Sequence, residues 1–215
     1  MPNHSHHLEL FDPKKACSLT VIGLGAIGSV VVESFARVGF DDITAIDHDS
    51  VSSHNVPMSA YGIHDVGFLK AQKLHDRVLE LTGIEIKIKS EKYQGEKLSS
   101  KVVISCVDDM DPRKEMWQNV QDRTSIELFC DSRLAGAYVE ILTVRPGAEV
   151  DKDRYNALLC DQKDTVRQTC GKHGIIYASL YAGSVLVANV LEYLESGVVR
   201  KWRDARRCDT LSQVF

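Results

Sequence analysis

Residues 20–49 limit most strongly what this chain of 215 residues can fold into. An apolar run at 19–22 leads directly into the pattern G-x-G-x-x-G at 23–28, and a helical pattern follows it. A second apolar run at 43–46 then ends at Asp47. A strand, a tight glycine turn, a helix and a second strand tipped by an acid are typical of a nucleotide-binding βαβ unit.

Each small residue of this turn has its own expected task. Gly23 allows the tight turn, Gly25 lets the backbone approach a phosphate, and Gly28 lets the helix pack closely on the strand. The helix that begins near Ala26 offers free N–H groups to anions. Asp47 stands where a carboxylate accepts hydrogen bonds from ribose hydroxyls. The pattern therefore predicts a nucleotide without saying which one.

Composition narrows the class of protein. A hydrophobic content of 44% is enough for a core, and no run reaches the ~20 apolar residues that a membrane span needs. The N-terminus lacks the features of a signal peptide, so we expect a soluble, cytoplasmic protein. The net charge of −4 gives no general attraction for nucleic acid. Six scattered cysteines indicate reduced thiols, and Cys106 and Cys130 lie in apolar runs that predict core positions.

The rest of the chain alternates apolar runs with periodic segments, and we expect an α/β fold. This fold would be Rossmann-like and doubly wound, with a mostly parallel sheet and antiparallel strands added at its C-terminal side. We expect one domain over 18–200, a flexible lead over 1–17 and a tail over 201–215. Further strands are predicted at 84–89, 101–107, 126–130 and 138–144, helices at 68–81, 112–123 and 174–196, and a mobile crossover segment at 147–173.

Four short blocks, taken in order, resemble the ThiF/MoeB/HesA superfamily, the adenylating domain of ubiquitin-activating-type enzymes. The resemblance covers residues 19–197, and the ordered set is more specific than any single block. The blocks are Asp47-x-Asp49-x-Val51 with Asn55, Asp65-Val66-Gly67 with Lys70-Ala71, Cys106-Val107-Asp108-Asp109 with Arg113, and Arg133 with Gly136.

This resemblance implies an activity that depends on ATP and Mg²⁺. In such enzymes the C-terminal carboxylate of a ubiquitin-like protein, or of a peptide, attacks the α-phosphate of ATP to give an acyl-adenylate and pyrophosphate. The activated group can then pass to a cysteine or another sulfur acceptor. The resemblance also implies a homodimer, and it leaves tRNA open as a different substrate.

The resemblance assigns roles to three charged residues. It implies that Lys70 contacts the phosphates and that Asp108 holds Mg²⁺ and the phosphates. The alternative for Asp108 is a helix cap before Pro112. Arg113 matches a family arginine that follows this aspartate, and the alternative is a solvated charge on a helix.

Four other positions complete the expected site. Asp47 is the ribose acid, Asn55 is a polar contact near the phosphates, and Asp49 belongs to the same motif or is an ordinary turn residue. Cys170 stands where relatives place an acceptor cysteine, and the alternative is an incidental loop thiol. Because no C-x-x-C pair occurs, a structural zinc is not expected.

The sequence also departs from the family pattern. Where the family has R-Q, this chain has Met58-Ser59, so an arginine that steadies the phosphates is absent. Only a short lead precedes the first strand. Arg113 or Arg133 could substitute, or the chain could be a catalytically reduced, nucleotide-binding partner subunit. An NAD(P)-dependent oxidoreductase is a further alternative, because the glycine pattern alone fits that class too.

Overall fold

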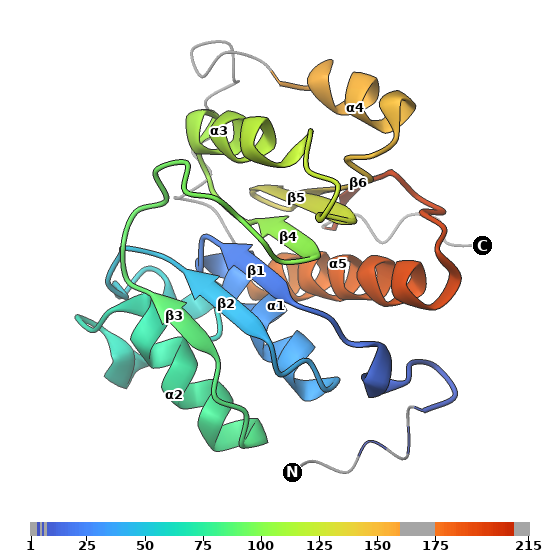
Figure 1. The fold of residues 1–215 in the computed structure, drawn as a ribbon. Helices are drawn as coiled ribbons and strands as arrows, with labels where there is room; N and C mark the ends of the chain where they lie inside the picture. Colours follow the sequence, from blue (N-terminus) through green and yellow to red (C-terminus); the bar gives the residue numbers. More distant parts are fainter. Residues whose placement is uncertain (1–3, 5, 7, 160–174, 209–215) are drawn as a thin grey trace.

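The structure, a computed structural model, describes residues 4, 6, 8–159 and 175–208. Within these residues, seven strands form one sheet in the order β3-β2-β1-β4-β5-β6-β7. The pairs from β3 to β5 are parallel, whereas β6 and β7 are antiparallel to their neighbours. The predicted Rossmann-like sheet with antiparallel strands at its C-terminal side is therefore confirmed (Figure 1).

The strands are β1 (Leu19–Ile22), β2 (Ile43–Ile46), β3 (Lys87–Lys89), β4 (Val102–Ser105), β5 (Leu128–Ala135), β6 (Tyr138–Val144) and β7 (Arg203–Arg207). The α-helices are α1 (Ala26–Arg37), α2 (Lys70–Thr82), α3 (Met110–Val120), α4 (Glu149–Asn156) and α5 (Ile176–Ser196). The described residues also form the short 3-10 helices η1 (Pro13–Lys15), η2 (Val56–Met58) and η3 (Ile63–Asp65).

Helices cover both faces of the sheet, and each face has its own core. Successive residues of a strand point to opposite faces, so Leu19 and Val21 of β1 join the core beneath α1, α2 and α5, whereas Ile22 joins the core beneath α3 and α4. Because both faces are buried, β1 and β4 consist of residues that are buried throughout. Figure 1 shows the two layers of helices, with α3 and α4 on one side of the sheet and α1, α2 and α5 on the other.

The strand order reverses between β1 and β4. From β1 the chain builds outward through β2 to β3, then returns to β4 on the other side of β1. In open α/β sheets, ligands bind outside the carboxyl ends of the strands at such a switch point. The loops that follow β1, β2 and β4 therefore define the place to look for a site.

Several predicted boundaries differ from the structure. The strand predicted at 126–130 extends to Ala135, because β6 pairs with it along the whole extension. A helix, α4, lies within the crossover segment predicted at 147–173; its low apolar content hid it, yet Tyr155 anchors it in the core. Strand β7 falls in the predicted tail, because arginines on an exposed edge strand resemble a solvated segment.

The helix α5 is less buried than its apolar sequence predicts. Its inner face packs on α1, where Gly183 allows close approach to Val30. Its first turns expose Ile176, Tyr177 and Leu180. In the described residues no helix has the length and apolar character needed to cross a membrane.

Part of the lead packs onto the domain. Phe11 is buried and stacks on Phe40, with ring centroids 5.8 Å apart. Lys15 forms an ion pair with Glu195 at the far end of α5. These contacts hold this part of the 1–17 lead against the end of the sheet that lies away from the switch point.

Candidate nucleotide site

The glycine turn after β1 is packed too tightly for side chains at two of its three glycines. A Cβ on Gly23, where φ is +88°, would lie 2.7 Å from the carbonyl oxygen of Cys106. A Cβ on Gly28 would lie 1.9 Å from the carbonyl oxygen of Gly23. The turn therefore rests directly on the end of β4, and α1 rests directly on the turn.

The third glycine is not crowded by any described residue. Gly25 is the N-cap of α1, which begins at Ala26, and a Cβ on Gly25 would meet no atom of the described residues within 4 Å. No side chain of the cap residue satisfies the first N–H groups of α1. The helix end therefore presents backbone donors and its positive dipole end to an open surface.

Asp47 braces this turn from the end of β2. Its Oδ2 accepts the Leu24 N–H at 2.6 Å, and its Oδ1 accepts the Asp49 N–H at 2.8 Å. Asp47 is 8% exposed. The predicted ribose acid thus also has a structural task, because it joins the ends of β1 and β2.

Lys70 is a buried cation beside two carboxylates. It is the first residue of α2 and is 7% exposed. Its Nζ lies 2.8 Å from Asp49 Oδ2 and 3.8 Å from Asp47 Oδ2. Partial burial acts to raise the pKa of the Asp49 carboxyl, but the hydrogen bond and charge of Lys70 outweigh it and hold this pKa below its ordinary value.

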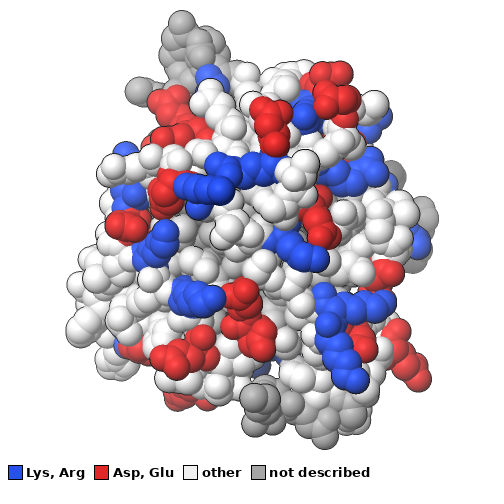
Figure 2. Space-filling view, viewed as in Figure 1, with Lys and Arg blue, Asp and Glu red and all other residues white. Residues whose placement is uncertain are grey.

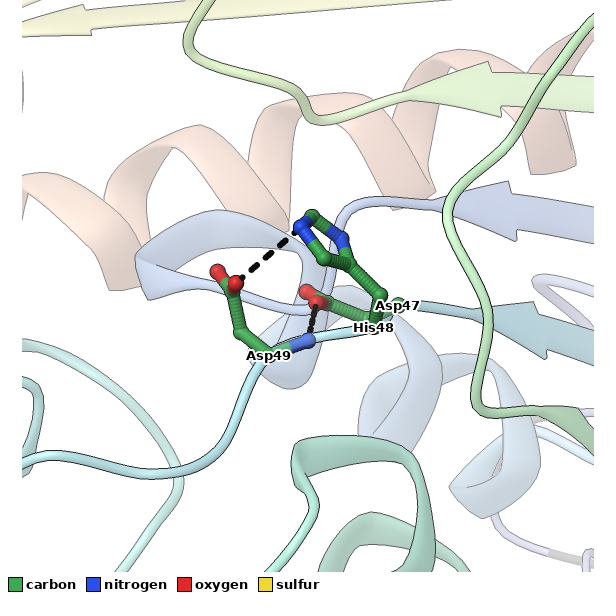
Figure 3. Close-up of side chains that lie close together, drawn as sticks. All are labelled: Asp47, His48 and Asp49. Atoms are coloured by element: carbon green, nitrogen blue, oxygen red, sulfur yellow. Dashed lines mark hydrogen bonds and ion pairs between the residues drawn. The ribbon is translucent and has the colours of Figure 1, made fainter.

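Figure 3 shows Asp47, His48 and Asp49 gathered after β2. The His48 Nε2 lies 3.3 Å from Asp49 Oδ1, and the ligand atoms of the three side chains lie within 4.8 Å of one another. Such a cluster can hold a cation, but Lys70 already lies beside both of its carboxylates. We therefore assign these carboxylates to the lysine and not to a metal ion.

Asp108 lies in the loop between β4 and α3, with an exposed side chain. Its carboxylate makes no hydrogen bond or ion pair with any residue that the structure describes. The N-cap of α3 is Asp109, so the alternative in which Asp108 caps that helix is wrong. Asp108 is thus an available carboxylate at the carboxyl edge of the sheet.

Arg113 is neither at the surface nor solvated, and the alternative of a solvated helix charge is therefore wrong. It is 4% exposed, and its Nε donates to Asp131 Oδ1 at 2.6 Å. Its other contacts are with backbone carbonyls. A direct contact between Arg113 and a nucleotide remains a prediction that these geometries do not favour.

The loop that carries Asn55 is held by its own polar groups. The Asn55 Oδ1 accepts hydrogen bonds from the N–H and the hydroxyl of Ser52. At the position of the missing motif, Ser59 Oγ donates to the Asn55 carbonyl at 2.7 Å. The Asn55 NH₂ group makes no hydrogen bond with a described residue, so it is available to a ligand.

Tyr61 is a site residue that the sequence did not reveal. Its buried hydroxyl donates to the carbonyl of Leu24 at 2.8 Å and lies 3.3 Å from the carbonyl of Lys70. It therefore links the glycine turn to the start of α2. The only signal in the sequence was an aromatic residue in a long polar loop.

Among the cysteines, Cys106 and Cys130 lie in or against the core, whereas Cys160 and Cys170 lie outside the described residues. Burial raises the pKa of the Cys106 thiol to about 12 and raises the pKa of the Cys130 thiol further. Cys130 is fully buried and Cys106 is partly buried against the same core, in agreement with the predicted core roles, and the raised pKa values keep both thiols protonated at neutral pH. The proposed acceptor role of Cys170 stays a prediction.

The first test compares Gly28→Ala with Gly25→Ala. Because a Cβ at residue 28 would strike backbone, we expect Gly28→Ala to destabilise the fold by about 3 kcal/mol or more, the upper end for overpacking. Gly25→Ala should change the free energy of unfolding by less than about 1 kcal/mol but should weaken binding of the predicted nucleotide. Chemical denaturation and calorimetric titration measure the two effects. Equal destabilisation by both changes would contradict this packing.

The second test follows the Asp49–Lys70 pair with pH. Since the pKa of Asp49 is lowered in the folded state, its contribution to stability is present above the ordinary aspartate pKa and is lost as the pH falls through the lowered value. Asp49→Asn should therefore lower the free energy of unfolding near neutral pH by less than about 1 kcal/mol, because the pair is partly exposed. The melting temperature should fall slightly. The difference from the unmodified chain should vanish in strong acid. A difference that grows as the pH falls would contradict the pairing.

Comparison with known proteins places this geometry in a family. The model of the ThiF family matches residues 11–204. The tRNA threonylcarbamoyladenosine dehydratase of Escherichia coli (strain K12) is 35% identical over 75 residues, which are 34% of this chain and 27% of that protein.

Solved structures agree on the fold. E. coli MccB superposes with a TM-score of 0.73 at 13% identity, covering 92% of this chain and 61% of its own. PaaA superposes with a TM-score of 0.71 at 12% identity, covering 91% of this chain and 65% of its own. This chain thus spans less than two thirds of these proteins. Because the family model matches most of its length, the chain belongs to the ThiF family.

Proposed function

We propose that this chain binds ATP with Mg²⁺ at the carboxyl edge of β1, β2 and β4 and adenylylates a carboxylate. Membership in the ThiF family supports adenylylation chemistry in general. The observation that carries the proposal is the grouping of a buried Lys70, an available Asp108 and an open helix end at Gly25 around one switch point. MccB, which shares the fold, has been solved with ATP.

The donor set fits a nucleotide triphosphate. The backbone N–H groups at the start of α1 would receive a phosphate, since no described residue fills the space beside Gly25. The Lys70 ammonium lies beside Asp47 and Asp49 and would neutralise part of the phosphate charge. Asp47 retains its position at the end of β2 for a ribose hydroxyl.

The charge balance of these side chains favours a metal requirement. The carboxylates of Asp47, Asp49 and Asp108 carry three negative charges, and Lys70 carries one positive charge, which leaves two negative charges. A triphosphate would be repelled by this site unless a divalent cation came with it. Asp108 is a carboxylate of the kind that Mg²⁺ prefers, and bound Mg²⁺ would stabilise charge on the leaving pyrophosphate.

The proposed reaction is an in-line transfer. A carboxylate oxygen of the substrate attacks the α-phosphorus of ATP, and a bond forms between them. The bond from the α-phosphorus to the bridging oxygen breaks, and pyrophosphate leaves with the electron pair. No proton need be transferred in this step, so the chain's own residues supply position and charge and not acid–base chemistry.

For the substrate we propose the C-terminal carboxylate of a ubiquitin-like protein or peptide. MccB has been solved with AMPCPP and MccA. Because this chain resembles MccB in fold alone, that structure gives limited support for a peptide substrate. A tRNA acceptor is the second candidate, supported by the match to the tRNA-modifying dehydratase. On the face drawn in Figure 2, acidic and basic side chains are interspersed and form no continuous basic field for a nucleic acid.

Two further expectations belong to this proposal. A homodimer follows from the family pattern, and the exposed apolar side chains at the start of α5 offer a surface that association would cover. Met58-Ser59 in place of R-Q supports the alternative of a partner subunit that binds nucleotide with little turnover. An NAD(P)-dependent oxidoreductase is disfavoured by the family match.

The third test separates these nucleotides and the metal by thermal stability. At a ligand concentration of 100 times Kd, Mg·ATP should stabilise the chain by about 2.7 kcal/mol, a rise in melting temperature of roughly 5–10 °C for a chain of this size. NAD should produce no rise. Asp108→Asn should remove most of the rise in melting temperature that depends on Mg²⁺.

The matched control is Asp111→Asn, an exposed acid in the first turn of α3, which should behave like the unmodified chain. Stabilisation by NAD and not by Mg·ATP would overturn the proposal. An Asp108→Asn variant that keeps the full response to Mg²⁺ would overturn the role of Asp108.

A further inference from the structure

Arg113 lies under the loop that carries Asp108. It stands in the first turns of α3, and its side chain is 5% exposed. The guanidinium makes four hydrogen bonds, to Asp131, Val107, Asp109 and Ser132. A side chain with so many protein partners is unavailable to a nucleotide without a rearrangement of the loop.

Two of these bonds fix the backbone on either side of Asp108. The Arg113 Nη2 donates to the carbonyl of Val107 at 2.5 Å, and its Nη1 donates to the carbonyl of Asp109 at 3.4 Å. Asp108 lies between these carbonyls, and its own side chain has no described partner. Arg113 therefore holds the backbone on both sides of the residue from which the Asp108 carboxylate projects.

The guanidinium itself is anchored by a fully buried carboxylate. Asp131 is 0% exposed, and its Oδ1 accepts from Arg113 Nε at 2.6 Å. Its Oδ2 accepts from the Tyr155 hydroxyl at 3.1 Å and from Arg133 Nε at 3.0 Å. Strand β5, helix α3 and helix α4 thus meet at one carboxylate, which cannot shift without breaking several hydrogen bonds.

Stability alone gives little reason to keep such a group. A buried ion pair often contributes no more to stability than apolar residues of the same volume, because both charges lose their hydration. What a guanidinium supplies and an apolar group cannot is a planar fork with several fixed donors. The value of Arg113 is therefore geometric, and the geometry it sets is that of the Asp108 loop.

We propose that Arg113, held by Asp131, is a positioning residue that aims the Asp108 carboxylate at the metal of a bound nucleotide. This inference rests on the proposed function and replaces direct catalysis by Arg113 with action through Asp108. Misplacement of a functional group by about 1 Å can lower the rate of an enzymatic reaction by about a hundredfold, so the position of such a group matters energetically. Loss of the fork should therefore weaken the metal-dependent part of nucleotide binding and spare the rest.

The test measures the dissociation constant of α,β-methylene-ATP by calorimetric titration, with Mg²⁺ and with EDTA. The ratio of the two constants gives the gain in affinity due to the metal. Arg113→Lys, which keeps the charge but not the fork, should reduce this gain about tenfold and leave the affinity in EDTA within about twofold. A purely structural role would weaken binding equally in both conditions.

A double-mutant cycle with Asp108→Asn distinguishes the route. If Arg113 acts through Asp108, Arg113→Lys causes no further loss of the metal-dependent gain in the Asp108→Asn background. Independent, additive losses would overturn the proposal. Tyr155→Phe, which removes one donor to Asp131, should give a smaller loss with the same dependence on Asp108, and it decides the question if Arg113→Lys does not fold.

The matched control is Arg145→Lys, since Arg145 pairs with the buried Asp151 at 2.7 Å and makes no hydrogen bond or ion pair with the described residues 106–109. Its metal-dependent gain should equal that of the unmodified chain. If the unmodified chain binds no ATP analogue in either condition, the proposed function fails. If it binds with a metal-dependent gain that Arg113→Lys and Tyr155→Phe both leave unchanged, this inference alone fails.

Discussion

The hydrogen bond between Asp47 and the Leu24 N–H, 2.6 Å long, is the contact on which the site depends. It joins the carboxyl ends of the adjacent parallel strands β1 and β2 and fixes the position of the glycine turn relative to β2. The same carboxylate also orders the Asp49 backbone, and Lys70 lies beside both acids. If the Asp47 carboxylate were removed, the Leu24 N–H, the Asp49 N–H and the Lys70 ammonium would each lose a partner.

The close packing beneath the turn explains why so little of it can vary. Gly23 and Gly28 are required by backbone atoms, since a Cβ at either would come within 3 Å of a carbonyl oxygen. At Gly25 no atom of a described residue lies within 4 Å of a built Cβ, so the described packing does not require glycine there, and the proposed phosphate would give a reason for it. Within this motif, Gly23 and Gly28 are thus explained by packing inside the protein, whereas Gly25 is explained by the proposed ligand.

The sequence predicted the centre of the sheet well because β1, β2 and β4 are almost completely buried and consist mainly of apolar residues. The bounds of β1, β2 and β6 follow directly from apolar runs. It could not predict α4 or β7, whose composition is that of solvated segments and whose place depends on Tyr155 and on pairing with β6. Lys70, Asp47 and Asp108 were found through motif spacing, but burial is a property of the fold, so the sequence could not show that Arg113 is inside and Asp108 outside.

The central claim is that one edge of the sheet receives Mg·ATP over the glycine turn. Hydrogen–deuterium exchange with α,β-methylene-ATP and Mg²⁺ tests it most directly, because it reports individual backbone amides without requiring turnover or a known acceptor. We expect slower exchange at residues 24–28, 47–49 and 106–110 and unchanged exchange in β6 and β7. Slower exchange confined to other segments, or none at saturating nucleotide, would contradict this claim.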